Sequence, residues 1–221
     1  MGRVLGVLGG MGPAATTAFM ARVQALTPAT RDEDHLHMLV DLNPHVPNRH
    51  TEPEAAGRML GEMAARLRDM GAEALAMPCN TAHAHAGTIG AASGLHFIDM
   101  IAETADAAAA GGARRIGVLA TPGGEALYAE ALAKRGQETV RLEGADRDAV
   151  MAAIFAVKAG DVGSGPRGEM RRLAGALVAA GAEAVIAGCT EVPLLIGAGD
   201  VAVPLVDSAE VLAAACVKAC A

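Results

Sequence analysis

Short apolar runs alternate with longer alanine-rich stretches along the whole chain. The apolar runs are rich in Val, Ile and Leu and predict strands at residues 3–8, 37–42, 74–77, 96–98, 115–119, 139–142, 184–187 and 203–206. The stretches between them have the length and composition of helices. This alternation is typical of a parallel sheet with helices on both faces, so the sequence predicts an α/β fold.

The chain contains an internal repeat. Residues 71–79 read Gly-Ala-Glu-Ala-Leu-Ala-Met-Pro-Cys and align without gaps on residues 181–189, Gly-Ala-Glu-Ala-Val-Ile-Ala-Gly-Cys. In the same order, Gly-Val-Leu at 6–8 recurs at 117–119, and Ile-Asp at 98–99 is matched by Val-Asp at 206–207. Three matches in register predict two similar doubly wound parallel-sheet domains related by pseudo-two-fold symmetry. We assign residues 1–100 plus 208–221 to the first half and 101–207 to the second, with the last helix packing back on the first half.

Composition narrows the kind of core and the kind of partner. The chain is 52% hydrophobic but only 2% aromatic, so aliphatic side chains must fill a core of helices packed on sheets. The formal net charge is −7 and no cluster of Lys and Arg occurs, which argues against a nucleic-acid partner. No apolar stretch is long enough for a membrane span and no signal-type segment is present, so we expect a cytoplasmic protein with a small-molecule partner and no membrane contact.

The four cysteines fall into two groups. Cys216 and Cys220 lie in an alanine-rich helical run, where we expect them to be buried core residues. Cys79 and Cys189 each follow the end of a predicted strand, where open α/β sheets bind ligands. If the halves are related by a two-fold axis, the active site lies in the cleft between them and these two thiols face each other across it.

Two facing thiols suit one kind of chemistry. Inverting a carbon centre that carries an acidic hydrogen needs a base on one face and an acid on the other, and a thiolate with a thiol supplies both. The attacking thiol needs a lowered pKa, which a helix N-terminus can provide. Residues that favour helix starts follow both cysteines: Asn80 and Thr81 in the first half, Thr190 and Glu191 in the second.

Four segments carry a resemblance to a known family. They are residues 8–13 (Leu-Gly-Gly-Met-Gly-Pro), 43–49 (Asn-Pro-His-Val-Pro-Asn-Arg), 77–83 (Met-Pro-Cys-Asn-Thr-Ala-His) and 187–193 (Ala-Gly-Cys-Thr-Glu-Val-Pro). Together they resemble the signature regions of the aspartate/glutamate racemase family, and aspartate racemases most closely. The resemblance implies that Cys79 and Cys189 are the acid/base pair, that no cofactor or metal is used, and that the subunit forms a homodimer.

The resemblance also implies further site residues. Arg49 matches an arginine that grips a substrate carboxylate, and Lys158 matches a lysine that meets a carboxylate of the same substrate. We expect Met11, Asn80, Thr81, Thr121 and Thr190 as additional substrate contacts, and Glu191 as a group that tunes Cys189. All of these except Met11 have a simpler interpretation: Arg49 as a loop charge, Lys158 as a helix C-terminal lysine, Thr121 as a turn residue, and the residues after the cysteines as helix starts.

Departures from the family's patterns bear on the substrate. Cell-wall glutamate racemases are expected to carry Asp-Ser-Gly after the first strand and Cys-Thr-His at the second cysteine. This chain has Gly-Gly-Met-Gly at 9–12 and Cys-Thr-Glu at 189–191. Aspartate therefore ranks first as substrate, while glutamate and a broad range of amino acids stay open.

Three other interpretations compete with a racemase. Residues 10–15, Gly-Met-Gly-Pro-Ala-Ala, fit a dinucleotide-binding fingerprint, and Asp41 ends the next strand, although it lies further along than usual. That oxidoreductase hypothesis leaves the paired cysteines unexplained. A non-catalytic protein that binds a dicarboxylate would need neither thiol. A zinc site at Cys79, His83 and His85 would lack a fourth ligand at a suitable spacing.

Overall fold

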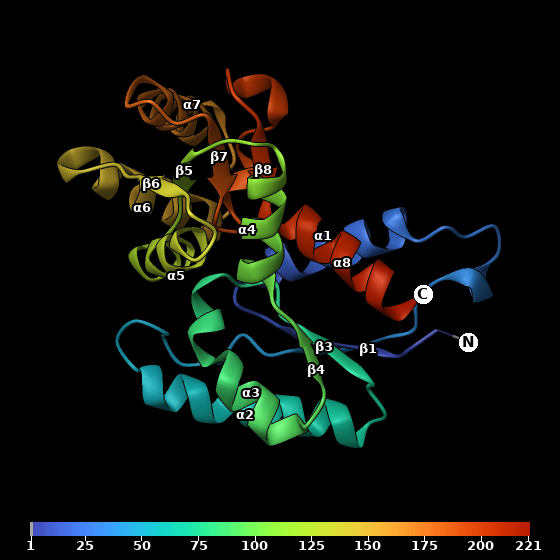
Figure 1. Cartoon of the computed structure of the whole chain (residues 1–221). Helices are drawn as coiled ribbons and strands as arrows, with labels where there is room; N and C mark the ends of the chain where they lie inside the picture. Colours follow the sequence, from blue (N-terminus) through green and yellow to red (C-terminus); the bar gives the residue numbers. More distant parts are fainter. Residues whose placement is uncertain (1) are drawn as a thin grey trace. The chain divides into compact units, whose positions relative to one another are not determined.

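The computed structural model describes residues 2–221 and divides into two compact units. The first holds the chain up to Glu103 together with Ala209–Ala221, and the second holds Thr104–Ser208. Each unit contains one four-stranded parallel sheet with helices (Figure 1). The predicted α/β class is confirmed.

The first sheet has the strand order β2-β1-β3-β4, with β1 at Leu5–Gly9, β2 at Met38–Leu42, β3 at Ala74–Ala76 and β4 at His96–Ile98. Helices α2 (Pro53–Asp69) and α3 (Ala86–Ser93) cover one face, and α1 (Pro13–Leu26) and α8 (Ser208–Cys220) cover the other (Figure 1). Strands β1 and β3 are buried along their whole length, as expected for strands covered by helices on both faces. A short 3-10 helix, η1 (Asp32–Asp34), lies between α1 and β2.

Helix α8 brings the end of the chain back to the first sheet. Its apolar residues pack with Phe19 and Val23 of α1 and with Leu5 and Val7 of β1. An ion pair between Arg22 of α1 and Glu210 of α8 lies at the rim of this contact, at 3.5 Å. Both cysteines of α8 are buried in the same core, which confirms their structural role.

The second sheet repeats this order as β6-β5-β7-β8, with β5 at Arg115–Leu119, β6 at Glu138–Val140, β7 at Ala184–Ala187 and β8 at Leu205–Asp207. Its helices are α5 (Pro122–Ala133), α6 (Gly144–Lys158) and α7 (Ser164–Ala179). Helix α4 (Met100–Ala110) leads from the first unit into the second. The 3-10 helix η4 (Ala198–Asp200) precedes β8.

The sequence repeat is a structural repeat. Gly71 and Gly181 both adopt positive φ, at 104° and 93°, three residues before the repeated strands begin. Two residues later, the carboxylates of Glu73 and Glu183 accept hydrogen bonds from the backbone N–H groups of Val4 and Arg114, at 2.8 and 2.6 Å. The same local design therefore joins the turn before the third strand to the beginning of the first strand in each unit.

All eight predicted strands exist. Those at 96–98, 115–119 and 184–187 have the predicted bounds, and each of the others begins and ends within two residues of the prediction. Among the described residues, no helix is both long and apolar enough to cross a membrane.

Candidate active site

The loop after β3 positions Cys79. Its N–H donates to the carbonyl of Met77 at 2.8 Å, which turns the chain as soon as the strand ends. The side chain is 6% exposed and packs in one apolar cluster with Met11 and Val46. The loops after β1, β2 and β3 therefore converge around this thiol, as expected at the carboxyl edge of a parallel sheet.

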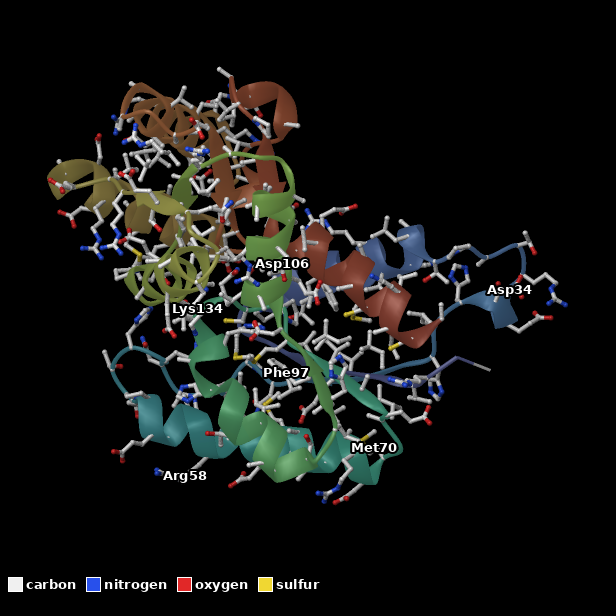
Figure 2. All side chains as sticks on the ribbon, in the orientation of Figure 1. Asp34, Arg58, Met70, Phe97, Asp106 and Lys134 are labelled. Carbon is white, nitrogen blue, oxygen red and sulfur yellow. The ribbon has the colours of Figure 1, made fainter. Side chains whose placement is uncertain are left out.

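His83 fixes the backbone on both sides of this loop. Its Nδ1 lies 2.9 Å from the carbonyl oxygen of Cys79, and its Nε2 lies 3.1 Å from the N–H of Met100. These partners require Nδ1–H as the donor and Nε2 as the acceptor, which is the neutral imidazole. The ring also packs on Phe97 of β4, labelled in Figure 2, with the ring centroids 5.2 Å apart. Burial lowers the pKa of His83 below its ordinary value of 6.5.

The loop between β1 and α1 comes close to the loop after β2. Gly10 has φ of 99°, and a Cβ there would overlap the backbone of Asn43. Its N–H donates to the hydroxyl of Thr16 at 2.9 Å, which ties the loop to the first turns of α1. Met11 is 4% exposed. The glycine at position 10 thus permits a close approach of two backbones. Asp41, the acidic residue of the dinucleotide hypothesis, forms an ion pair with Arg66 at 2.8 Å.

Arg49 lies in the loop after β2, and its guanidinium makes few hydrogen bonds to the protein. Nη1 donates a long hydrogen bond of 3.4 Å to the carbonyl of Pro47. Nε is buried without a hydrogen-bond partner within residues 2–221. A buried N–H donor without a partner is costly, so a site of this kind suits an added acceptor. The charge of Arg49 adds to the effect of burial in lowering the pKa of His85.

In the second unit, Cys189 belongs to a three-residue chain of polar contacts. Its thiol donates to Oε2 of Glu191 at 2.9 Å, and Oε1 of the same carboxylate lies 3.2 Å from Nζ of Lys158. The hydroxyl of Thr190 donates to Oε2 at 3.4 Å. Cys189, Thr190 and Glu191 are all at least nine-tenths buried, whereas the Lys158 side chain is 33% exposed.

One expectation about this cysteine is wrong, and a second is met only by a short 3-10 helix. Burial and the Glu191 carboxylate raise the pKa of the Cys189 thiol well above its ordinary range, instead of lowering it, and the opposing effect of Lys158 is smaller. The expected helix start is present only as a three-residue 3-10 helix, η3 (Val192–Leu194), with Glu191 as its N-cap. After Cys79 the chain likewise forms a 3-10 helix, η2 (Thr81–His85), before α3.

Of the remaining predicted contacts, Thr121 is the N-cap of α5. Its hydroxyl accepts a hydrogen bond from the N–H of Gly124 at 3.2 Å, so its helix-start role is present. Asn80 is 2% exposed and Thr81 is half-buried. Asn80 is the N-cap of η2 and Glu191 is the N-cap of η3, but neither side chain makes a capping hydrogen bond.

The structure therefore brings the predicted residues into two groups. Cys79 and Met11 lie together in the first unit, and Cys189, Thr190, Glu191 and Lys158 lie together in the second. The sequence did not predict the two hydrogen bonds by which His83 links the carbonyl of Cys79 to the N–H of Met100, the His83 clasp. It also did not predict the ion pair between Lys158 and Glu191. The Cys-Thr-Glu spacing was the one available signal for the second. Within residues 2–221, no group of three or more His, Cys, Asp or Glu side chains could hold a metal ion.

Comparison with known proteins identifies the family. The model of the Asp/Glu/hydantoin racemase family matches residues 8–216. The chain belongs to this family. The predicted resemblance is thereby confirmed, and the match spans all four signature segments that carried it.

Several relatives of this racemase-family chain are known. It is 28% identical to the Picrophilus torridus aspartate racemase, with a TM-score of 0.87 over 98% of this chain and 94% of that chain. The broad specificity amino-acid racemase RacX of Bacillus subtilis is 30% identical over 107 residues, 46% of this chain and 47% of that protein. The glutamate racemase of Synechococcus sp. (strain CC9605) is 31% identical over 157 residues, 68% of this chain and 56% of that protein. The matches thus span about half the length of these two curated relatives.

Proposed function

We propose that the chain is a cofactor-independent amino-acid racemase that acts on aspartate, with Cys79 and Cys189 as its acid/base pair. One thiolate removes the Cα hydrogen as a proton, and the other thiol gives its own proton to the opposite face of the carbanion. The product is the mirror image of the substrate, and the thiolate and thiol have exchanged places. The proposal requires both thiols to reach one substrate carbon from opposite sides.

The repeated cysteine is the observation that carries this proposal. Cys79 and Cys189 occupy the same position in the two copies of the repeat, just after β3 and β7, and both are buried. Two core cysteines would have no reason to recur at the ligand-binding edge of two sheets. Membership of a racemase family agrees with a use for both thiols.

A dicarboxylic substrate is supported by the two cations. Arg49 has a buried Nε without a partner, and a guanidinium can hold a carboxylate with two parallel hydrogen bonds. Lys158 is already bound to a carboxylate, that of Glu191, and is partly exposed. Similarity to an aspartate racemase over nearly the whole of both chains supports aspartate as the first substrate to test.

A broad substrate range is the second candidate. The match to the broad specificity racemase of Bacillus subtilis favours it, and the match to a glutamate racemase keeps glutamate in the panel. We further propose that the protein is cytoplasmic and that the subunit works as a homodimer. Sedimentation of the purified protein tests the homodimer directly.

The deciding experiment follows loss of the α-hydrogen in deuterated water. We expect the wild-type protein, without added cofactor, to racemise L-aspartate and to introduce deuterium at Cα, measured by circular dichroism and proton NMR. Cys79→Ala and Cys189→Ala should each lower the racemisation rate at least about 100-fold, the usual contribution of an acid or base group.

Cys216→Ala is the matched control, because it removes a buried cysteine that lies in the core of α8. It should keep most of the activity. Racemisation of alanine, lysine or arginine at similar rates would favour the broad-range candidate. If the wild-type protein racemised no amino acid of a full panel, the racemase proposal would be wrong.

A further inference from the structure

The contacts of Cys189 bear on a question that the repeat leaves open, which is the protonation state of each thiol in the resting protein. The Sγ to Oε2 distance of 2.9 Å places the proton of one group between the Cys189 sulfur and the Glu191 carboxylate. The other carboxylate oxygen is bound by Lys158 at 3.2 Å. A carboxylate paired with a lysine is ionised, so the shared proton belongs to the sulfur.

We propose that Cys189 rests as the proton-bearing thiol of the pair, and that Glu191, held in place by Lys158, is the positioning residue that keeps the proton there. The inference rests on the proposed function for its meaning in catalysis. The assignment leaves Cys79 as the member of the pair that must ionise to start the reaction. The resting form then reacts first with the enantiomer whose Cα–H faces Cys79.

The surroundings of the thiol support this assignment. Cys189 is 8% exposed and Glu191 is 4% exposed, so little water reaches either group to screen the negative charge. The charged groups that act on this thiol in the described part of the chain are Glu191 and Lys158. A thiolate beside the Glu191 carboxylate would put two negative charges in contact, with Lys158 compensating only one of them.

Lys158 links this arrangement to substrate binding. Its ammonium group has one described carboxylate partner, and the side chain is 33% exposed. If the substrate carboxylate draws Lys158 away, Glu191 keeps its full negative charge beside the thiol, and the thiol holds its proton more firmly. Substrate binding then favours Cys189 as the proton donor in that half of the cycle.

Alkylation of the free protein tests the assignment without any need for activity. Iodoacetamide reacts with thiolates, and peptide mass spectrometry reads Cys79 and Cys189 separately. In wild type we expect slow labelling of Cys189 at about pH 8. Glu191→Gln keeps the shape of the side chain but removes the charge, and should speed labelling of Cys189 at least about tenfold, the change in thiolate population for one pKa unit.

Three further variants make the result specific. Glu191→Asp retains the charge and should keep labelling slow. Lys158→Met removes the cation and should make labelling slower still, which also tests the proposal if Glu191→Gln does not fold. Glu125→Gln removes another buried glutamate of the second unit, one that faces Arg141 and Arg147, and should leave Cys189 unchanged.

The outcomes separate this inference from the proposed function. Labelling of Cys189 that is as fast as that of a free thiol, or a Glu191→Gln rate within about twofold of wild type, overturns the assignment even if the protein racemises aspartate. A Glu191-dependent change in labelling supports the assignment even if no amino acid is racemised. Midpoints of labelling against pH distinguish a changed thiol from a loosened fold, which would speed labelling of both cysteines.

Discussion

His83 shows how a single buried side chain can set the backbone beside a cysteine. Its two ring nitrogens bond to the carbonyl of Cys79 and the N–H of Met100, which belong to the loop after β3 and the beginning of α4. Both bonds require the neutral ring, and burial lowers its pKa. Protonation of His83 is therefore coupled to unfolding.

This coupling predicts a pH dependence of stability. Below the ordinary histidine pKa of 6.5, the unfolded chain binds a proton at this position and the folded chain does not. The free energy of unfolding should therefore fall as pH drops below about 6.5, by up to about 1.4 kcal/mol per pH unit from this residue. Urea unfolding between about pH 7 and pH 5 measures the slope.

His83→Gln should be less stable at neutral pH, because the two buried hydrogen bonds are lost or distorted, and should lack this contribution to the slope. His96→Gln is the control, because its ring is exposed in β4 and remains in water on unfolding. An equal pH slope in wild type and His83→Gln would show that protonation of His83 is not linked to folding.

At the same scale, the sequence predicted the cysteines and Glu191 as a group that tunes Cys189, but not the ion pair between Glu191 and Lys158. A strand end and a repeated motif marked Cys79 and Cys189, because both features can be read from the order of residues alone. The bond between Lys158 and Glu191 joins residues on α6 and beyond β7, and only the packed fold brings them together. The direction of the pKa shift of Cys189 was wrong for the same reason: burial and an adjacent carboxylate outweigh the lysine.

At the scale of elements, the strands were predictable because buried parallel strands are continuous apolar runs. The helices expected directly after the cysteines begin as 3-10 helices, η2 and η3, and not as α-helices, and the hydrogen bonds explain the first of these. The ring of His83 takes the Cys79 carbonyl, and the His83 N–H donates instead to Asn80 at 3.0 Å, which makes a 3-10 turn. Residues 197–199, Gly-Ala-Gly, follow the second cysteine segment soon after η3, and glycine gives helices little support.

The loop between β1 and α1 yields a prediction at this scale. Gly10→Ala should lower the free energy of unfolding by about 1–3 kcal/mol, because alanine is strained at φ of 99° and its Cβ would overlap Asn43. Racemisation should fall as well, since Met11 and Cys79 share the cluster beside this loop. Chemical denaturation and the aspartate assay measure the two effects.

Gly90→Ala is the control in the same unit, and it should change stability in the opposite direction. Gly90 lies within α3 and a Cβ there meets nothing within 4 Å, so alanine should stabilise the helix by up to about 1 kcal/mol. If both substitutions had the same effect on stability, backbone strain at Gly10 would not be the cause.

At the scale of the whole molecule, the duplication gives each unit the same strand order and one cysteine after its third strand. Either unit therefore has half of the proposed acid/base pair. The surroundings of the two cysteines have diverged: Cys189 has the Lys158–Glu191 pair, whereas the loop of Cys79 has the His83 clasp. Duplicated scaffolds with unlike surroundings suit two thiols that begin the cycle in different protonation states.

This division of roles predicts what one remaining thiol can do. In the proposed mechanism, each enantiomer of aspartate presents its Cα–H to one cysteine. Cys189→Ala should then still exchange the α-hydrogen of one enantiomer with deuterated solvent, because Cys79 can remove a proton and return a deuteron to the same face. Cys79→Ala should exchange the other enantiomer, and more slowly at neutral pH, because Cys189 must first lose the proton that the Glu191 carboxylate stabilises on its sulfur.

Proton NMR of separate D- and L-aspartate samples measures this exchange, and a chiral assay measures inversion alongside it. Adding Glu191→Gln to the Cys79→Ala variant should speed its exchange, since Cys189 then ionises more easily. Exchange of both enantiomers by either single-cysteine variant would show that one thiol reaches both faces of the substrate. That result would replace the two-thiol mechanism with a single base serving the whole site.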